Sequence, residues 1–410
     1  MSTEVEVAGP WSPLRRRVFR WLWISSLVSN LGTIMHTVGA GWAITSLTSS
    51  PAVVSLAQTA WTVPGFLFAL LAGAIADVID RRRVIVVTQA SGMVVAAALG
   101  VLEISGHLDV PLLLLGTFLL SVALTLSAPA FIALLPELVP IEELPQAIGL
   151  NAIAYNGPQS LGPALAGVVI AFSGPGAVFL LNAVSFLGIV IIVNAYRPPV
   201  AMTTADETVM AAMRTGLRYF RGHRSLQRFA VRIMLAFAVT SAVTALLPVV
   251  ARHQLHVAAG SFGLLAAALG VGAVLAIWLL PAARLAAGPD VIVAVAGIVW
   301  AAGAGLLAVT HTVWVAIVGL VFAGVGQMAT MNTVYSLFMT QLPAWVRGRS
   351  SSVVMLVVWL GASVGAFGWG ALASGIGIGT ALGAAAATQL AVTVLAYVPL
   401  RLDRPDTFAQ

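Results

Sequence analysis

A cluster of charged residues interrupts residues 73–85, which read GAIADVIDRRRVI. The whole chain is only 8% charged and 60% hydrophobic, yet this short stretch holds Asp77, Asp80, Arg81, Arg82 and Arg83. Carboxylates form charge-assisted hydrogen bonds with guanidinium groups, and they also interact with the positive N-terminal end of a facing helix. Gly73 and Ala74 are small enough to let a neighbouring helix approach closely. The pattern predicts a polar clasp between two parts of the molecule that opens when something competes for it.

The composition indicates a membrane protein. Soluble domains carry about 25% charged residues, whereas this chain of 410 residues has 8% and a mean hydropathy of +1.01. The net charge of +6 does not indicate nucleic-acid binding, because the arginines lie at the ends of apolar stretches rather than in patches interleaved with aromatic residues. In a membrane protein, basic loops report orientation instead.

Several kinds of chemistry are excluded by the residues that are missing. The sequence has no cysteine, and all 20 of its basic residues are arginine. Disulfides, thiolate metal sites, a phosphate-binding loop with its lysine and a lysine Schiff base are therefore absent. Paired carboxylates and histidines at metal-ligand spacing are also missing, so we expect no enzyme, no cofactor and no metal. Any uphill transport must draw on an ion gradient or on another chain.

Twelve apolar stretches are long enough to cross a bilayer core as helices, which takes about 20 residues. An even number of spans places both termini on one side, and 19 of the 20 arginines then share that side; only Arg252 lies outside. The positive-inside rule predicts cytoplasmic termini on this basis. The spans are residues 19–46, 53–78, 83–104, 110–135, 144–172, 176–195, 226–251, 259–283, 290–309, 312–340, 346–373 and 377–399.

The chain divides into two sets of six spans. The expected units are a tail (1–18), a first six-helix bundle (19–196), a central loop (197–225), a second bundle (226–400) and a tail (401–410). Within the loop, residues 208–221 carry arginines at helical spacing beside an apolar face, which indicates either an amphipathic surface helix or a plain linker. The related stretches LPELVPIEELPQAIGLNAI (135–153) and MTQLPAWVRGRSSSVVML (339–356) support an internal repeat, a common plan in transporters.

Few polar side chains lie inside the predicted spans. His36 is the one ionisable residue away from the span ends, which makes it a candidate by default. It can carry a proton for coupling, because histidine titrates near neutrality, or it can form a neutral hydrogen-bonding wall of a cavity; both roles remain open. Asn30 and Thr33 lie on roughly the same face of that span.

Other polar and aromatic residues suggest a substrate cavity. Tyr155 and Gln159 are four residues apart, with Asn156 beside them, and this stripe either lines a cavity or joins helices. Span 10 also contributes Met331. Aromatic and methionine side chains with a few amides make an adaptable apolar pocket suited to neutral or amphiphilic cargo, although each tryptophan is more simply explained by packing. The predicted cavity residues are Asn30, Thr33, His36, Trp61, Tyr155, Asn156, Gln159, Gln327, Asn332, Tyr335 and Trp359.

The charged cluster resembles a family signature. GAIADVIDRRR is similar to the loop 2–3 motif of the major facilitator superfamily, G-x-x-x-D-[RK]-x-G-R-[RK]; Gly73, Asp77, Arg81 and Arg82 match, while Val78 and Asp80 depart from it. The resemblance is closer to the branch that includes the enterobactin exporter and secretion-effector permeases, on the stretches FRWLWISSLVSNLGT, TSLTSSPAVVSL and LPELVPIEELPQAIGLN. NGPQSLGPALAG is similar to the span-5 motif of facilitator antiporters, through the matching residues Gly162, Pro163 and Gly167.

The resemblance implies a fold and a function. The expected fold is all-α, with twelve transmembrane helices in two pseudo-symmetric bundles. Asp77 and Arg81 would gate the cytoplasmic side, with Asp77 facing the start of span 11 near residues 347–350. We expect a monomeric exporter in a bacterial inner membrane that moves a small, fairly apolar or amphiphilic organic molecule, a drug or a secondary metabolite, by proton-coupled alternating access. The alternatives are a dedicated siderophore exporter and a non-transporting sensor or assembly partner.

Overall fold

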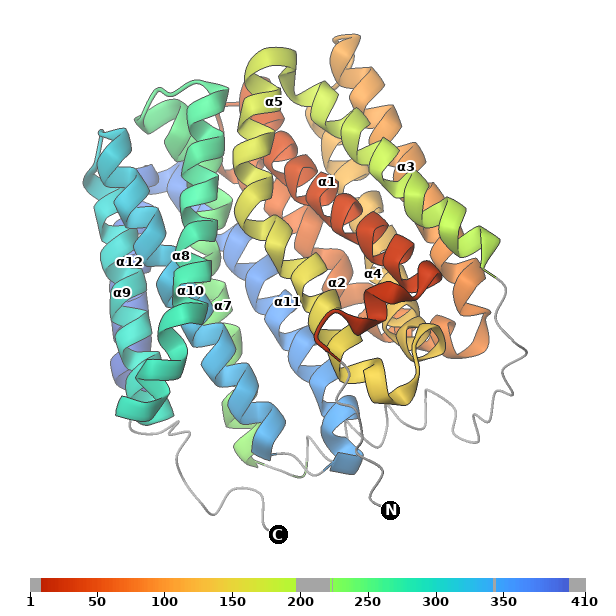
Figure 1. The fold of residues 1–410 in the computed structure, drawn as a ribbon. Coiled ribbons are helices and arrows are strands. Elements are labelled where there is room, and N and C mark those ends of the chain that lie inside the picture. Colours follow the sequence, from red (N-terminus) through yellow and green to blue (C-terminus); the bar gives the residue numbers. More distant parts are fainter. Residues whose placement is uncertain (1–8, 197–221, 223, 342–343, 398–410) are drawn as a thin grey trace.

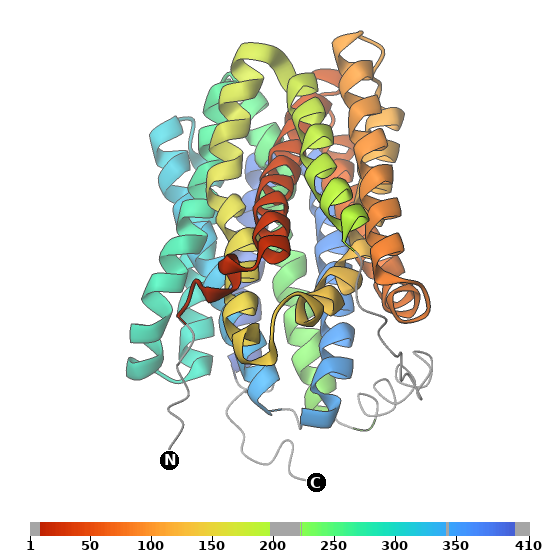
Figure 2. The same cartoon turned by 45° about the vertical axis from the view of Figure 1, so that its right-hand side comes forward.

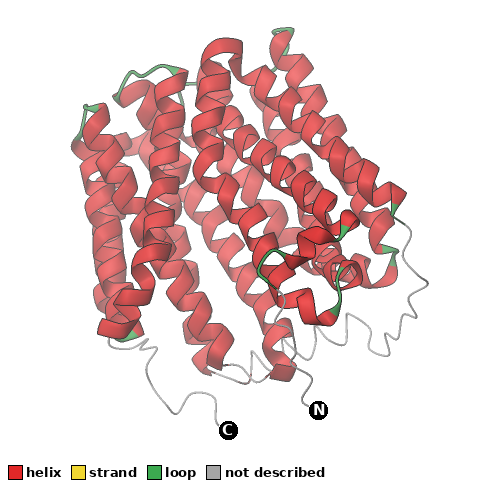
Figure 3. Cartoon of the chain, viewed as in Figure 1, coloured by secondary structure: helices red, strands yellow, loops and turns green. Residues whose placement is uncertain are grey.

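The computed structural model describes residues 9–196, 222, 224–341 and 344–397, and within these ranges the chain is helical with no strand (Figure 3). The tails, most of the central loop and its predicted surface helix at 208–221 lie outside the described residues. The label α5 covers two consecutive helices, so the labelled elements contain twelve helices in all. They are α1 (Arg17–Leu47), α2 (Pro51–Val78), α3 (Arg81–Ile104), α4 (Val110–Leu138), α5 (Leu144–Ala195), α7 (Arg224–Val249), α8 (Ala259–Ala286), α9 (Pro289–Val309), α10 (Val313–Gln341), α11 (Ala344–Ile376) and α12 (Ile378–Tyr397).

The helices form two halves that lie side by side (Figure 1). In the first half α5 packs against α1 and α3, and α4 packs against α2 and α3; in the second, α10 packs against α8 and α9, and α7 against α11. The main contacts between the halves join α2 to α11 and α5 to α8. In two related six-helix bundles, α2 corresponds to α8 and α5 corresponds to α11. The pair α2–α11 is then equivalent to the pair α8–α5, as expected for such a repeat.

The bundle has two ends, which we name for reference. The terminal face is the end where α1 begins and α12 ends, and the opposite face holds the turn between α1 and α2. Figure 2 shows the long helices running between these two ends. A helix rises about 1.5 Å per residue, so α1, with 31 residues, is long enough to cross a hydrocarbon core about 30 Å thick.

Local signals in the sequence set the helix boundaries. Asp80 caps α3 by accepting hydrogen bonds from the backbone N–H groups of Arg82 (2.8 Å) and Arg83 (3.2 Å). Asp109 caps α4 by accepting from the N–H of Leu112 at 2.8 Å. Inside α5 the chain reverses at Gly174, whose φ of 76° lies in the left-handed region that favours glycine, just before Pro175. The reversal therefore lies between the predicted spans 144–172 and 176–195.

Hydropathy and length support the membrane assignment. Among the described residues, nine helical segments are apolar and long enough to cross a bilayer, and α12 contains a shorter apolar segment, Ile378–Val394. One of the nine, Leu161–Ala195, contains the reversal at Gly174. α1 does not meet the same criterion. The expected all-α fold with twelve helices in two bundles is confirmed.

Candidate functional site

The charged loop ties together three helices of the first half. Arg81 donates through Nη1 to Glu137 Oε1 and to the backbone oxygen of Ala133 (3.2 Å), both on α4. Arg82 donates to the backbone and side-chain oxygens of Asn194 near the end of α5. The carboxylate that pairs with Arg81 is thus Glu137, which the sequence analysis did not single out. Both arginines contact only their own half through these bonds.

Tyr196 extends this network at the end of α5. Its hydroxyl donates to the backbone oxygen of Glu137 at 3.3 Å. Burial and the charge of the Glu137 carboxylate raise the pKa of the Tyr196 hydroxyl. The end of α5 is therefore held against the end of α4 at the terminal face.

The predicted gate falls partly outside the described residues. The side chain of Asp77 and those of residues 347–350 are not among them, so the contact between the two stays a prediction. Gly73 is described, and a Cβ added there would meet no described atom within 4 Å. Close packing of a helix against Gly73 stays a prediction, because the side chains at the start of α11 lie outside the described residues.

α2 and α11 meet in the part of the bundle nearer the opposite face. The Ser363 hydroxyl of α11 donates to the Thr62 hydroxyl of α2 at 2.8 Å, and both residues are buried. The Trp359 ring covers Gly65, where an added Cβ would lie 2.8 Å from the ring. Trp359 is thus a contact between the halves, and the glycine at position 65 is what makes room for it.

α5 and α8 meet through glycines in the same part of the bundle. A Cβ at Gly167 would lie 2.6 Å from the Cα of Gly263, and one at Gly263 would lie 2.9 Å from the backbone oxygen of Pro163. Gly162 instead faces α1, where a Cβ would lie 2.7 Å from the side chain of Ile34. The three predicted span-5 motif residues therefore serve helix packing, and two of them form the interface between the halves.

An arginine and two aromatic rings also join the halves at the opposite face. The guanidinium of Arg252, which follows α7, lies 5.3 Å from the centre of the Trp42 ring on α1 and 3.5 Å from the Thr45 hydroxyl. The Trp42 ring stacks on Phe262 of α8 with centroids 5.3 Å apart and 28° between the planes. Arg252 is the one arginine predicted outside, and this contact gives it a structural role. We call Arg252, Trp42 and Phe262 the aromatic latch.

His36 is buried between helices of the first half. It is fully buried, its ring lies 4.5 Å from that of Phe179, and neither ring nitrogen has a hydrogen-bond partner among the described residues. Asn30 donates to the backbone oxygen of Ala154 at 3.0 Å, and Thr33 is buried with its hydroxyl 3.5 Å from Asn182 Oδ1. These contacts turn this face of α1 toward α5, and the cavity-wall role of these residues stays a prediction.

The predicted polar stripe of α5 is exposed. Tyr155 is 58% exposed, Gln159 is exposed, and Asn156, also exposed, bonds back to the oxygen of Ala152 within its own helix at 2.9 Å. The alternative in which these side chains join helices is therefore not supported by the contacts described.

Three other predicted cavity residues occupy different places. Trp61 packs into an apolar cluster of the first half with Phe186. Asn332 accepts from Arg284 at 3.2 Å, which links α10 to α8. Gln327 is partly buried. The structure does not bring these three together.

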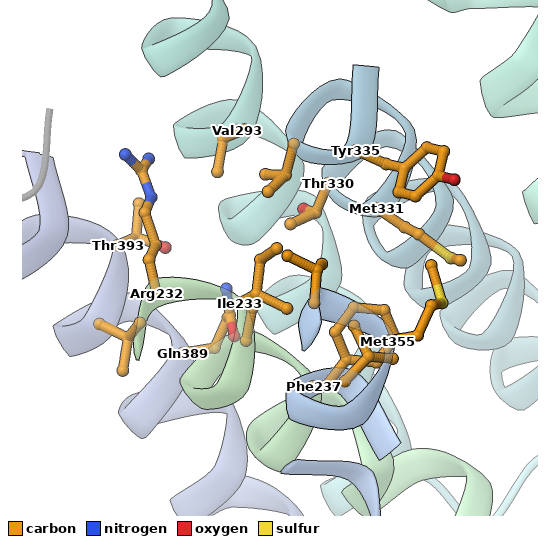
Figure 4. A pocket seen from close by; sticks show the side chains of 15 residues that line it. Arg232, Ile233, Phe237, Val293, Thr330, Met331, Tyr335, Met355, Gln389 and Thr393 are labelled. Atoms are coloured by element: carbon orange, nitrogen blue, oxygen red, sulfur yellow. The ribbon is translucent and has the colours of Figure 1, made fainter. Parts of the chain in front are cut away.

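A pocket lies inside the second half, between α7, α9, α10, α11 and α12 (Figure 4). Met331 and Tyr335, more than a third exposed, lie on one side of it, and Gln389 and Thr393 lie on the other. Tyr335, one of the predicted cavity residues, lies in the lining of this pocket. The free cavity volume of the pocket is about 40 Å³, and its mouth opens to solvent. Its lining residues are Arg232, Ile233, Ala236, Phe237, Val293, Thr330, Met331, Val334, Tyr335, Val354, Met355, Val358, Gln389, Val392 and Thr393.

A buried ion pair borders this pocket. Arg232 Nη1 of α7 donates to Asp290 Oδ1 of α9 at 2.7 Å, and the side chains are only 7% and 5% exposed. The expectation that His36 was the one ionisable residue inside the spans is therefore wrong. The sequence analysis missed the pair because each residue falls close to a predicted span end, where charges are ordinary. The sequence did contain a signal for the pair, because Arg232 lies six residues after the start of the predicted span 226–251.

Comparisons with known proteins agree with this architecture. The chain is 24% identical over 263 residues to the staphyloferrin A transporter of Staphylococcus aureus, covering 64% of this chain and 66% of that protein. It is 22% identical over 238 residues to macrolide efflux protein A of Streptococcus pyogenes, covering 57% and 58%. The chain thus spans less than two thirds of each of these relatives.

Solved structures show the same fold. A bacterial homologue of the human lysosomal transporter Spinster superposes with a TM-score of 0.72 at 15% identity, covering 93% of this chain and 94% of that one. These relatives are transporters rather than enzymes. The sequence model described as transmembrane secretion effector matches residues 8–409, nearly the whole chain. The chain therefore belongs to the transmembrane secretion effector family of major facilitator superfamily transporters.

Proposed function

We propose that this membrane transporter exports a small, fairly apolar or amphiphilic organic molecule by alternating access. The observation that carries the proposal is the combination of an apolar pocket in the second half with contacts between the halves near the opposite face. The pocket is lined mainly by aliphatic, methionine and aromatic side chains, which adapt to apolar cargo. Its α11 residues, Val354, Met355 and Val358, lie within the five positions before Trp359, which contacts the first half.

The contacts define one state of the proposed cycle. The aromatic latch, the Gly167–Gly263 contact and the Thr62–Ser363 hydrogen bond all hold the opposite face closed. In the proposal the terminal face is cytoplasmic, as the arginine distribution predicts, and cargo enters from that side. Release then requires these contacts to separate while the halves close at the terminal face, where Asp77 would act.

Proton coupling is part of the proposal, with His36 as the candidate carrier. His36 lies between α1 and α5 and has no hydrogen-bond partner among the described residues. A transferred proton therefore needs a rearrangement or a water molecule to reach it. The efflux assay is therefore run with and without a pH gradient, which tests whether transport depends on protons.

Efflux from proteoliposomes tests the proposal. Purified monomeric protein is reconstituted with a panel of neutral amphiphiles, hydrophobic cations and siderophores, with and without a pH gradient. We expect gradient-stimulated efflux of an amphiphile that Asp77→Asn removes. Asp80→Asn is the matched control, because Asp80 caps α3 and its loss should leave transport largely intact. If no compound moves, the protein does not transport the proposed cargo class.

A second candidate is a dedicated siderophore exporter. It is favoured by the similarity to a relative named for staphyloferrin A. The same panel separates the two, since a dedicated exporter would move a siderophore and leave the neutral amphiphiles in place.

A further inference from the structure

The pocket of the second half has one buried polar group that the packing leaves unsatisfied. Gln389 on α12 is 5% exposed, and its Oε1 has no hydrogen-bond partner among the described residues. Buried polar groups are nearly always paired, and a native exception commonly marks a site for a water molecule or a ligand. Gln389 lines the pocket and lies across it from the exposed Tyr335 (Figure 4).

The backbone of α9 makes room for this amide. A Cβ at Gly297 would lie 2.9 Å from Gln389 Nε2 and would also collide with the hydroxyl of Thr393. Glycine at 297 therefore allows Gln389 and Thr393 to occupy the floor of the pocket side by side. Any larger residue would displace both polar groups.

The one charged side chain in the described lining of the pocket already has a partner. Arg232 is the one charged side chain in the described lining, and it is paired with Asp290 at 2.7 Å. The lining contains no acid that could neutralise a cationic ligand. A charged ligand would have to be buried without a free counter-ion, which is costly in a low-dielectric site.

We propose that this pocket binds the uncharged end of an apolar molecule and that the Gln389 amide accepts a hydrogen bond from one O–H or N–H donor on it. The inference rests on the proposed function, since it takes the pocket as the cargo site, and it names the class of cargo. Met331, Met355 and Phe237 contact the apolar body, and Gln389 fixes its orientation. Selectivity comes from the single donor, because an apolar wall alone discriminates weakly between similar shapes.

A matched pair of probes tests the inference in detergent, where no transport is needed. 2-Naphthol has one donor and its methyl ether has none, and binding to the purified full chain is measured by equilibrium dialysis. We expect the wild-type protein to bind the naphthol about tenfold more tightly than the ether, as one hydrogen bond to a buried acceptor allows. Gln389→Leu should remove this preference while keeping affinity for the ether. Thr388→Val, at an exposed position of the same helix outside the pocket, should preserve it.

The outcomes are distinct. A preference for the naphthol that survives in Gln389→Leu, equal binding of both probes by the wild type, or no binding of either would overturn the inference. If Gln389→Leu does not fold, Gly297→Ala serves instead, with the same expected loss of preference. Efflux without a preference for the naphthol would support the proposed function and refute only the Gln389 site. A preference for the naphthol without efflux would support the Gln389 site and refute the proposed function.

Discussion

The aromatic latch gives the sharpest test of how the opposite face is held closed. Trp42 of the first half lies between two residues of the second half, with Arg252 and Phe262 each 5.3 Å from its ring centre. Trp42→Leu keeps an apolar side chain at this position but removes both ring interactions. The substitution should therefore weaken the closed state without unfolding either half.

The size of the effect follows from the two interactions. A stacked aromatic pair contributes about 0.5–1.5 kcal/mol beyond its buried area, and a partly exposed cation–π contact contributes about 0.5–1.5 kcal/mol. We take the combined loss as about 1–3 kcal/mol. A loss of this size raises the ratio of open to closed molecules about 5-fold to 150-fold.

Cysteine labelling reads this ratio directly, because the chain has no cysteine of its own. Ala166 is fully buried in an apolar cluster to which both halves contribute. In an Ala166→Cys background, maleimide labelling in detergent reports how often this interface opens. We expect Trp42→Leu to increase the labelling rate about 5-fold to 150-fold.

The matched control is Trp21→Leu. Trp21 also lies near an arginine, with Arg20 6.0 Å from its ring centre, but both belong to the start of α1 and are remote from the opposite face. This control should leave the labelling rate unchanged. A rate in Trp42→Leu within twofold of its parent, or an equal increase in Trp21→Leu, would refute the latch.

Four further substitutions test other parts of the structure. Asp77→Asn should abolish net export while leaving membrane insertion intact, and full efflux activity would remove the gate from the proposal. Asp290→Asn should destabilise the protein by about 3–5 kcal/mol, because it removes the carboxylate that the buried Arg232 guanidinium contacts at 2.7 Å; thermal unfolding checks this, and Arg232→Met with Asp290→Leu should recover most of the loss. Gly167→Leu should force α5 from α8 and raise labelling at the opposite face, so an unchanged rate would contradict the close contact. His36→Gln should stop gradient-driven efflux, and persistence of uphill export would exclude His36 as the proton carrier.

The sequence by itself determined the class of protein and the order of its helices. Long runs of apolar residues with 8% charge can satisfy their backbone in lipid only as helices. The turns were also readable, because Gly174 and Pro175 end one helix and start the next, and Asp80 and Asp109 supply N-caps. These are local signals, so they do not depend on how the helices later pack.

The partners of the charged residues depended on the tertiary structure. Arg81 meets Glu137 from 56 residues away, and Arg232 meets Asp290 from 58 residues away. The sequence showed that the loop 2–3 arginines needed acceptors, but several carboxylates were available at the same end of the bundle. Helix packing selected between them.

The tertiary structure also decided which face of each helix is buried. His36, predicted to line a cavity, is fully buried against Phe179, whereas Tyr155 is 58% exposed. In a soluble protein, apolar periodicity would have separated the buried face from the exposed one. Lipid tails are as apolar as leucine, so a membrane helix shows a similar hydrophobic surface toward lipid and toward its neighbours. Only the packing of one helix against another then distinguishes a pocket such as that around Gln389 from the interior of the bundle.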